Sequence, residues 1–167
     1  MRMTWFGFGL TVALHAGPTF ASEVWISCNG TQTVRHWFND KLQDDNSHAA
    51  AAKIYRIDSE SEKVEIYYPN NRSLYQIGRG GSSLYDNITF GNSIIRLWCE
   101  KHCPSGATNE VNKFLEIDRK TLHFLEASDT KGLQSRTDIP MASSNRTEGQ
   151  CAVIQSQPVG PDPANKL

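Results

Sequence analysis

The chain has 167 residues, with 17 Lys and Arg against 18 Asp and Glu, so its formal net charge is −1. Acidic and basic residues are interspersed, and this pattern excludes the basic stripe expected of a protein that binds nucleic acid or an anionic membrane surface. The length is sufficient for one domain with a substantial hydrophobic core.

Residues 1–21 have the layout of a secretory signal. Arg2 precedes an apolar run that ends at Leu14, and Thr19 and Ala21 suit positions −3 and −1 of a signal-peptidase site. The run is too short for a stable transmembrane span. A buried N-terminal strand or helix is the alternative. We expect a signal peptide over 1–21, a single β-rich domain over 22–155, and a disordered, Pro-rich tail over 156–167.

All four cysteines follow this predicted signal: Cys28, Cys99, Cys103 and Cys151. An even number of cysteines behind a signal peptide indicates two disulfides and an oxidising compartment, so we expect a periplasmic or secreted protein. Three pairings are open. We favour Cys28–Cys151, which would join the opening strand to the closing strand, together with Cys99–Cys103, which would hold a turn around Pro104.

Alternation of apolar and polar residues dominates the rest of the chain, and no long helical stripe appears. Strands are predicted over residues 23–28, 31–38, 52–58, 63–68, 73–78, 84–90, 93–99, 111–117, 121–127 and 150–155. Two polar segments lie outside this pattern: we expect a loop with one helical turn over 39–51 and a long loop over 128–148. The predicted fold is all-β, a small antiparallel meander barrel or sandwich with disulfides.

One strand–turn–strand pattern occurs twice, as KIYRIDSESEKVEIYY over residues 53–68 and as KFLEIDRKTLHFLEAS over 113–128. In each copy an Ile-Asp pair ends the first strand. An Asp at this position can accept hydrogen bonds from backbone N–H groups two or three residues later, so Asp58 and Asp118 are predicted to initiate turns. We expect the first turn to be longer than the second. Internal duplication and independent convergence both remain open.

Several residues are compatible with catalysis or metal binding, but each has a simpler structural interpretation. Asp58, Asp118 and Glu116 resemble the carboxylates of a glycoside hydrolase, although turn capping by Asp is far commoner. The cluster of Cys99, His102 and Cys103 resembles a metal site, but exported cysteines tend to form disulfides. We therefore expect no catalytic residue, no metal and no cofactor.

Aromatic residues are frequent along the predicted strands and could line a ligand cavity or fill the core of a small barrel. We favour the core, since small barrels are normally packed solid. The strand around NSIIRLWC is apolar on both faces, which indicates that both of its faces are covered. The aromatic residues concerned are Trp25, Trp37, Tyr55, Tyr67, Tyr68, Tyr75, Tyr85, Phe90, Trp98, Phe114 and Phe124.

Short motifs along the chain resemble those of small exported bacterial proteins without a characterised function. These motifs are Cys28-Asn29-Gly30-Thr31, Ile57-Asp58, Ile117-Asp118-Arg119 with Thr121, and Gly149-Gln150-Cys151. Such proteins often have Gly after the Thr, where this chain has Leu122. This resemblance implies an exported domain and no particular activity.

A second resemblance is to periplasmic inhibitors of C-type lysozyme, which are small β-barrels with a disulfide. Residues 24–40 are similar to the opening of these inhibitors, and SSLYDNITFGN over 82–92 is similar to a motif whose Ser enters the lysozyme cleft. The resemblance implies a binding loop that contains Ser82, Ser83 and Tyr85.

Together these observations predict an exported, non-enzymatic β-domain that binds a protein or a small molecule through its loops, with no nucleic-acid partner and no stable membrane insertion. A periplasmic hydrolase inhibitor of the lysozyme-inhibitor kind and a small-ligand-binding barrel are the alternatives. An apolar cavity open at one end would favour the barrel, and an exposed loop carrying Tyr85 or Ser83 would favour the inhibitor.

Overall fold

The computed structural model describes residues 23–78, 84–100, 109–133 and 139–155, and the regular structure within these ranges is entirely β-strand. Ten strands form one antiparallel sheet, which confirms the predicted all-β class. Their bounds are β1 Glu23–Phe38, β2 Lys41–Ala49, β3 Lys53–Asp58, β4 Lys63–Tyr68, β5 Ser73–Gln76, β6 Asn87–Phe90, β7 Ile94–Cys99, β8 Glu110–Asp118, β9 His123–Leu133 and β10 Pro140–Ile154. Within the described ranges, no helix meets the length and apolarity needed to cross a membrane.

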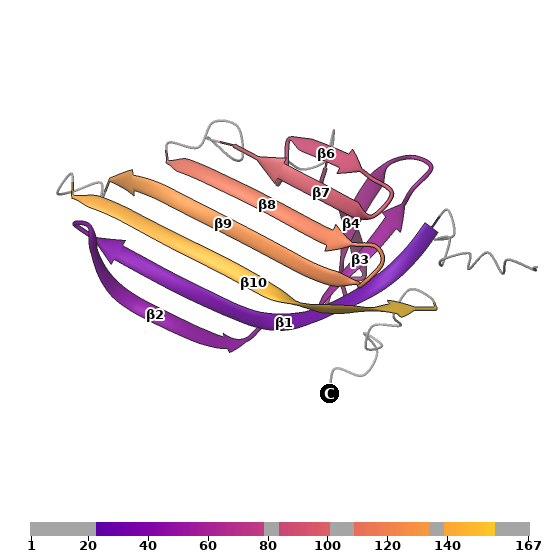
Figure 1. Cartoon of the computed structure of the whole chain (residues 1–167), viewed down its shortest axis with the longest axis horizontal. Coiled ribbons are helices and arrows are strands. Elements are labelled where there is room, and N and C mark those ends of the chain that lie inside the picture. The colour runs from indigo at the N-terminus through magenta and orange to yellow at the C-terminus, as the bar shows by residue number, and fades with distance from the viewer. Residues whose placement is uncertain (1–22, 79–83, 101–108, 134–138, 156–167) are drawn as a thin grey trace, which may run out of the picture.

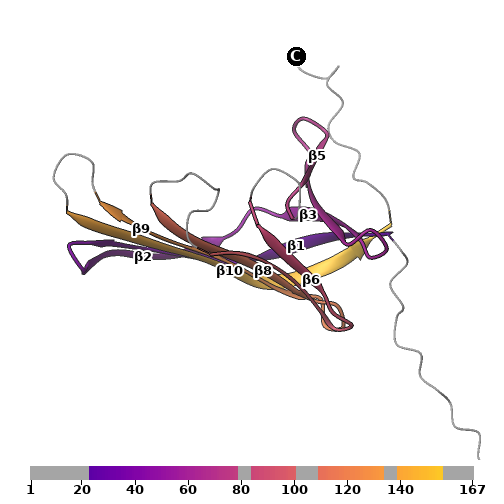
Figure 2. The ribbon, with the colours of Figure 1, turned by 90° about the horizontal axis from the view of Figure 1, so that it is seen from above.

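The sheet has the order β5-β4-β3-β1-β10-β9-β8-β7-β6, and β2 pairs with β1 outside this path. It curls into a half-barrel, so the predicted barrel is present in an open form with β5 and β6 at the ends of the strand order. The long strands β1, β9 and β10 run from this half-barrel into a flatter sheet that ends with β2 (Figures 1 and 2).

Strand β1 has two partners in tandem along one edge. Residues 23–28 pair with β3, residues 31–38 pair with β2, and the opposite edge pairs with β10. Gly30 faces Gly149 near the change of partner, and a Cβ on either residue would collide with the backbone of the other strand. Only glycine permits this close approach. We use the term distal sheet for β2 together with residues 31–38, 126–133 and 140–147.

The hydrophobic core lies on the inner face of the half-barrel. Ile95 and Leu97 of β7 pair with Ile117 and Leu115 of β8, and all four side chains are buried because alternate residues of a strand share one face. The same alternation places residues of β1, β3, β4, β6 and β9 in this core. Other members are Ile26, Cys28, Tyr55, Ile57, Val64, Ile77, Tyr85, Ile88, Phe124 and Cys151.

The predicted disulfide between Cys28 and Cys151 is confirmed. The two residues are direct partners on β1 and β10, with a Cα–Cα distance of 3.9 Å, and the bond joins positions 123 residues apart. Cys99 is also disulfide-bonded, and Cys103, its predicted partner, lies outside the described residues. The predicted signal peptide and tail lie outside them as well.

The two predicted loops are wrong. Residues 41–49 form β2, and all nine of these residues are exposed. The predicted loop over 128–148 contains the end of β9 and the start of β10. Both segments are polar on both faces, so they lack the alternation from which a half-buried strand is recognised. Asn39 and Asp40 both have positive φ, of 48° and 58°, and make the two-residue hairpin between β1 and β2.

The repeated Ile-Asp hairpins use one turn at both places. The Asp58 carboxylate accepts hydrogen bonds from the backbone N–H groups of Glu60 and Ser61, at 3.0 and 3.1 Å. The Asp118 carboxylate accepts the equivalent bonds at 2.7 and 2.9 Å. These bonds bear out the turn role predicted for both acids. The expected difference in turn length is wrong, because each Asp is separated from the next strand by four residues.

Candidate functional site

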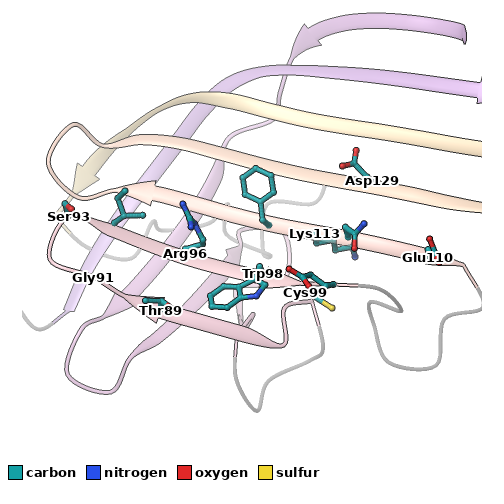
Figure 3. A pocket seen from close by; sticks show the side chains of 13 residues that line it. Thr89, Gly91, Ser93, Arg96, Trp98, Cys99, Glu110, Lys113 and Asp129 are labelled. Atoms are coloured by element: carbon teal, nitrogen blue, oxygen red, sulfur yellow. The ribbon is translucent and has the colours of Figure 1, made fainter.

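A groove of about 800 Å³ lies mainly on the face of the sheet opposite the core (Figure 3). Strands β6 to β9 and the turn between β6 and β7 form it. We call it the outer groove, and it is lined by Thr89, Gly91, Ser93, Ile94, Arg96, Trp98, Cys99, Glu100, Glu110, Asn112, Lys113, Phe114 and Asp129. Its size is within the range of small-molecule binding pockets.

Two aromatic residues form the centre of the outer groove. Trp98 of β7 and Phe114 of β8 are direct cross-strand partners, so both side chains lie on the same face of the sheet. Leu97 and Leu115 are also cross-strand partners and are fully buried on the opposite face. Trp98 and Phe114 are only partly buried, and they therefore offer a paired aromatic surface to solvent.

Charged and polar side chains border this aromatic pair. On one side, Arg96 binds the carboxylate of Glu116 through Nε, with an N–O distance of 2.9 Å, and through Nη2. On the other side lie Glu110, Asn112 and Asp129. Glu110 and Asp129 have no ion pair within the described part of the chain, so their carboxylates are available to a ligand.

The predicted binding loop is not brought together as a surface site. Tyr85 is only 6 % exposed and belongs to the core, so the expectation that it contacts a partner is wrong. Its hydroxyl donates a hydrogen bond to Glu126, at 3.5 Å. Burial, and then the negative charge of Glu126, raises the pKa of the Tyr85 hydroxyl far above its usual value. Ser82 and Ser83 lie outside the described residues.

A polar network covers the inner face where the core ends. Lys53 of β3 pairs with Glu126 of β9 across the two strands that lie between them. Farther along this face, the Gln32 amide donates to Asn145 at 2.7 Å, and His48 contacts Gln32 at 3.1 Å. The inner face of the distal sheet therefore has hydrogen-bonded polar side chains in place of the apolar residues of the core.

The residues considered for catalysis or metal binding take other roles. Asp58 and Asp118 are engaged in turns, and Glu116 is paired with Arg96. Each carboxylate accepts hydrogen bonds that stabilise its ionised form, and these bonds lower the pKa of both carboxyls. The bonds from Ser61 to Asp58 and from Thr121 to Asp118 have the greatest effect. In the described ranges no three His, Cys, Asp or Glu residues are grouped to hold a metal. His102 and Cys103 of the considered metal cluster lie outside these ranges.

Sequence reasoning missed the outer groove because it assigned Trp98 and Phe114 to the core. The alternation within NSIIRLWC does place Trp98 opposite Leu97, and this was the available signal. The position of Phe114 beside Trp98 depends on the register of β7 and β8, which no short pattern specifies.

Comparison with known proteins returned no matching family model, curated protein or solved structure. The function of the outer groove is therefore inferred from the chemistry of its own residues.

Proposed function

We propose that the chain is an exported, non-catalytic binding domain and that the outer groove is its binding surface. The observation that carries this proposal is the aromatic pair of Trp98 and Phe114, which is partly exposed on the face opposite the core. Exposed aromatic residues beside polar groups are typical of surfaces that bind a partner, because the rings supply contact area and the rim supplies orientation.

The composition of the outer groove supports binding more than catalysis. Its described lining contains no histidine, and its one cysteine, Cys99, is disulfide-bonded. The hydroxyls of Thr89 and Ser93 therefore have no imidazole beside them in this lining that could act as a general base. The same groups are suitable hydrogen-bond donors and acceptors for a ligand.

Export is supported by two independent features of the chain. The Cys28–Cys151 bond is of a kind that persists in oxidising compartments, and residues 1–21 have the composition of a secretory signal. Mass spectrometry of the purified protein, with and without reduction, tests this part of the proposal. A mature chain that begins at Ser22 is expected. A retained leader would contradict export by signal-peptidase cleavage.

The alternatives have less structural support. A small-ligand barrel needs an internal cavity, whereas the void among Ile26, Ile57, Ile95 and neighbouring core residues leaves no room for a water molecule. A lysozyme-type inhibitor needs an exposed loop, whereas Tyr85 is buried. Direct measurement of lysozyme activity in the presence of the protein tests the inhibitor alternative.

The binding proposal is tested by a thermal-shift screen of soluble sugars, peptides and metabolites against the exported protein. A ligand of the outer groove should raise the melting temperature of the wild type but not that of Trp98→Ala. The matched control is Trp37→Ala, because Trp37 is a partly buried tryptophan on the same face of the sheet but outside the groove. Circular dichroism verifies that both variants are folded. If every ligand found raises the melting temperature of Trp98→Ala and Phe114→Ala as much as that of the wild type, the proposal is wrong.

A further inference from the structure

We infer that the ligand of the outer groove is a flat saccharide chain of β-1,4-linked pyranose units. This inference rests on the proposed function and specifies its ligand. A pyranose ring has an apolar face of C–H groups and a rim of hydroxyl groups. It therefore requires an aromatic surface to stack on and polar side chains around the edge of that surface.

The aromatic surface is present at the centre of the outer groove. Trp98 and Phe114 lie side by side on adjacent strands, and directly opposed Cβ atoms of such pairs are about 5 Å apart. The groove extends over four adjacent strands, β6 to β9, which corresponds to roughly 14 Å across the sheet. This length accommodates more than one sugar ring. An extended, ribbon-like chain fits the open sheet better than a coiled one.

The rim has the mixture of donors and acceptors that hydroxyl groups need. Arg96 has guanidinium N–H groups beyond those that bind Glu116, the Asn112 side chain contains both an amide N–H and a carbonyl oxygen, and Asp129 contains carboxylate oxygens. Planar side chains of this kind can bind two neighbouring hydroxyls at once. Figure 3 shows Arg96 and Asp129 on opposite sides of the Trp98 position.

The charge of the lining disfavours other ligand classes. The lining contains three acidic side chains and two basic ones. The positive charge of one of the basic side chains, Arg96, is already compensated by Glu116. The acidic residues are Glu100, Glu110 and Asp129, and the other basic residue is Lys113. A nucleotide or another phosphate ester would approach uncompensated carboxylates at one end of the groove. A fatty or purely aromatic ligand would leave several of these polar groups desolvated and unpaired. A neutral polyhydroxyl chain incurs neither cost.

The test is isothermal titration of the exported protein with chitotetraose and cellotetraose, with maltotetraose as the α-linked control. At least one β-linked chain should bind, with maltotetraose weaker. Trp98→Ala should weaken binding by about tenfold or more, and Phe114→Ala by roughly fivefold, whereas Trp37→Ala should have no effect. Asn112→Ala, which leaves the aromatic pair intact, gives a second test and should weaken binding by roughly threefold.

The outcomes separate the saccharide inference from the binding proposal. If neither β-linked chain binds up to about 10 mM, the saccharide inference is wrong. If oligolysine or another probe then binds the wild type but not Trp98→Ala, the outer groove is still a binding site, but for a different class of ligand. If a saccharide binds equally well to the wild type, Trp98→Ala and Phe114→Ala, it binds elsewhere, and the inference is likewise overturned.

Discussion

Single residues in the two Ile-Asp turns are in backbone conformations that their side chains disfavour. Glu62 and Leu122 occupy equivalent positions, four residues after Asp58 and Asp118, and have positive φ values of 51° and 57°. Glycine adopts this conformation without a steric cost. This geometry explains why Gly is suited to the position of Leu122. In this chain Leu122 also packs against the core, which offsets the conformational cost.

Glu62→Gly should therefore stabilise the protein. Glu62 is exposed, so the substitution removes the left-handed conformational cost without losing core packing. The expected gain is about 0.5–1 kcal/mol in the free energy of unfolding, after the greater entropy of an unfolded glycine is included. Urea denaturation measures it. Glu60→Gly is the control, since Glu60 lies in the same turn without positive φ and its substitution should be neutral or destabilising.

The lowered pKa values of Asp58 and Asp118 make a pH-dependent contribution to stability. The folded pKa of each lies below the ordinary value of 3.8, so the folded state favours the ionised form. The resulting stabilisation is fully present above pH ~4 and is lost as the pH falls through the lowered pKa values. Asp58→Asn with Asp118→Asn should make stability less dependent on pH below ~4. Denaturation midpoints at several pH values provide the measurement, and an unchanged slope would contradict the assignment.

At the scale of strands, the close approach of the paired strands β1 and β10 at Gly30 and Gly149 is a tight steric constraint. Gly149→Ala would place a Cβ 2.1 Å from the Asn29 carbonyl oxygen and 2.5 Å from the Gly30 Cα, and these backbone atoms cannot rotate aside as a side chain can. We expect a loss of about 2–3 kcal/mol in the free energy of unfolding. The control is Gly132→Ala, a strand glycine whose added Cβ would meet only the movable Asn109 side chain. Equal effects of the two substitutions would contradict a special role for the close approach at Gly30 and Gly149.

The strands around the core, each with one buried face, are predicted from the sequence. Residues 93–99 alternate between Ile95, Leu97 and Cys99 on the inner face and Arg96 and Trp98 on the outer face, and β7 was predicted within one residue. Strand β2 was missed because neither of its faces is buried, so its sequence has no apolar period. The outer groove was missed for a different reason. It depends on register between strands, which is a property of the folded sheet.

At the scale of the whole molecule, the Cys28–Cys151 bond links the first described strand to the last. Because it closes a long loop, with a sequence separation of 123 residues, it should restrict the unfolded chain strongly. Replacing both cysteines with Ala should reduce the free energy of unfolding by about 4–5 kcal/mol. Urea denaturation of the double variant against the wild type measures the loss. A loss below ~1 kcal/mol would contradict a strong restriction of the unfolded chain by this bond.

Among the described residues, none forms a second layer over the distal sheet. All nine residues of β2 are exposed, and the adjoining end of the sheet exposes Phe38, Leu133 and Met141. In the described structure, interstrand hydrogen bonds protect the amide protons of the distal sheet from exchange. The amide protons of β7 and β8 are protected by such bonds and also by the adjacent buried core. Amide hydrogen exchange should therefore divide the molecule into two regions at Gly30 and Gly149, with rapid exchange through local opening of β2 and slow exchange near the global limit in β7 and β8.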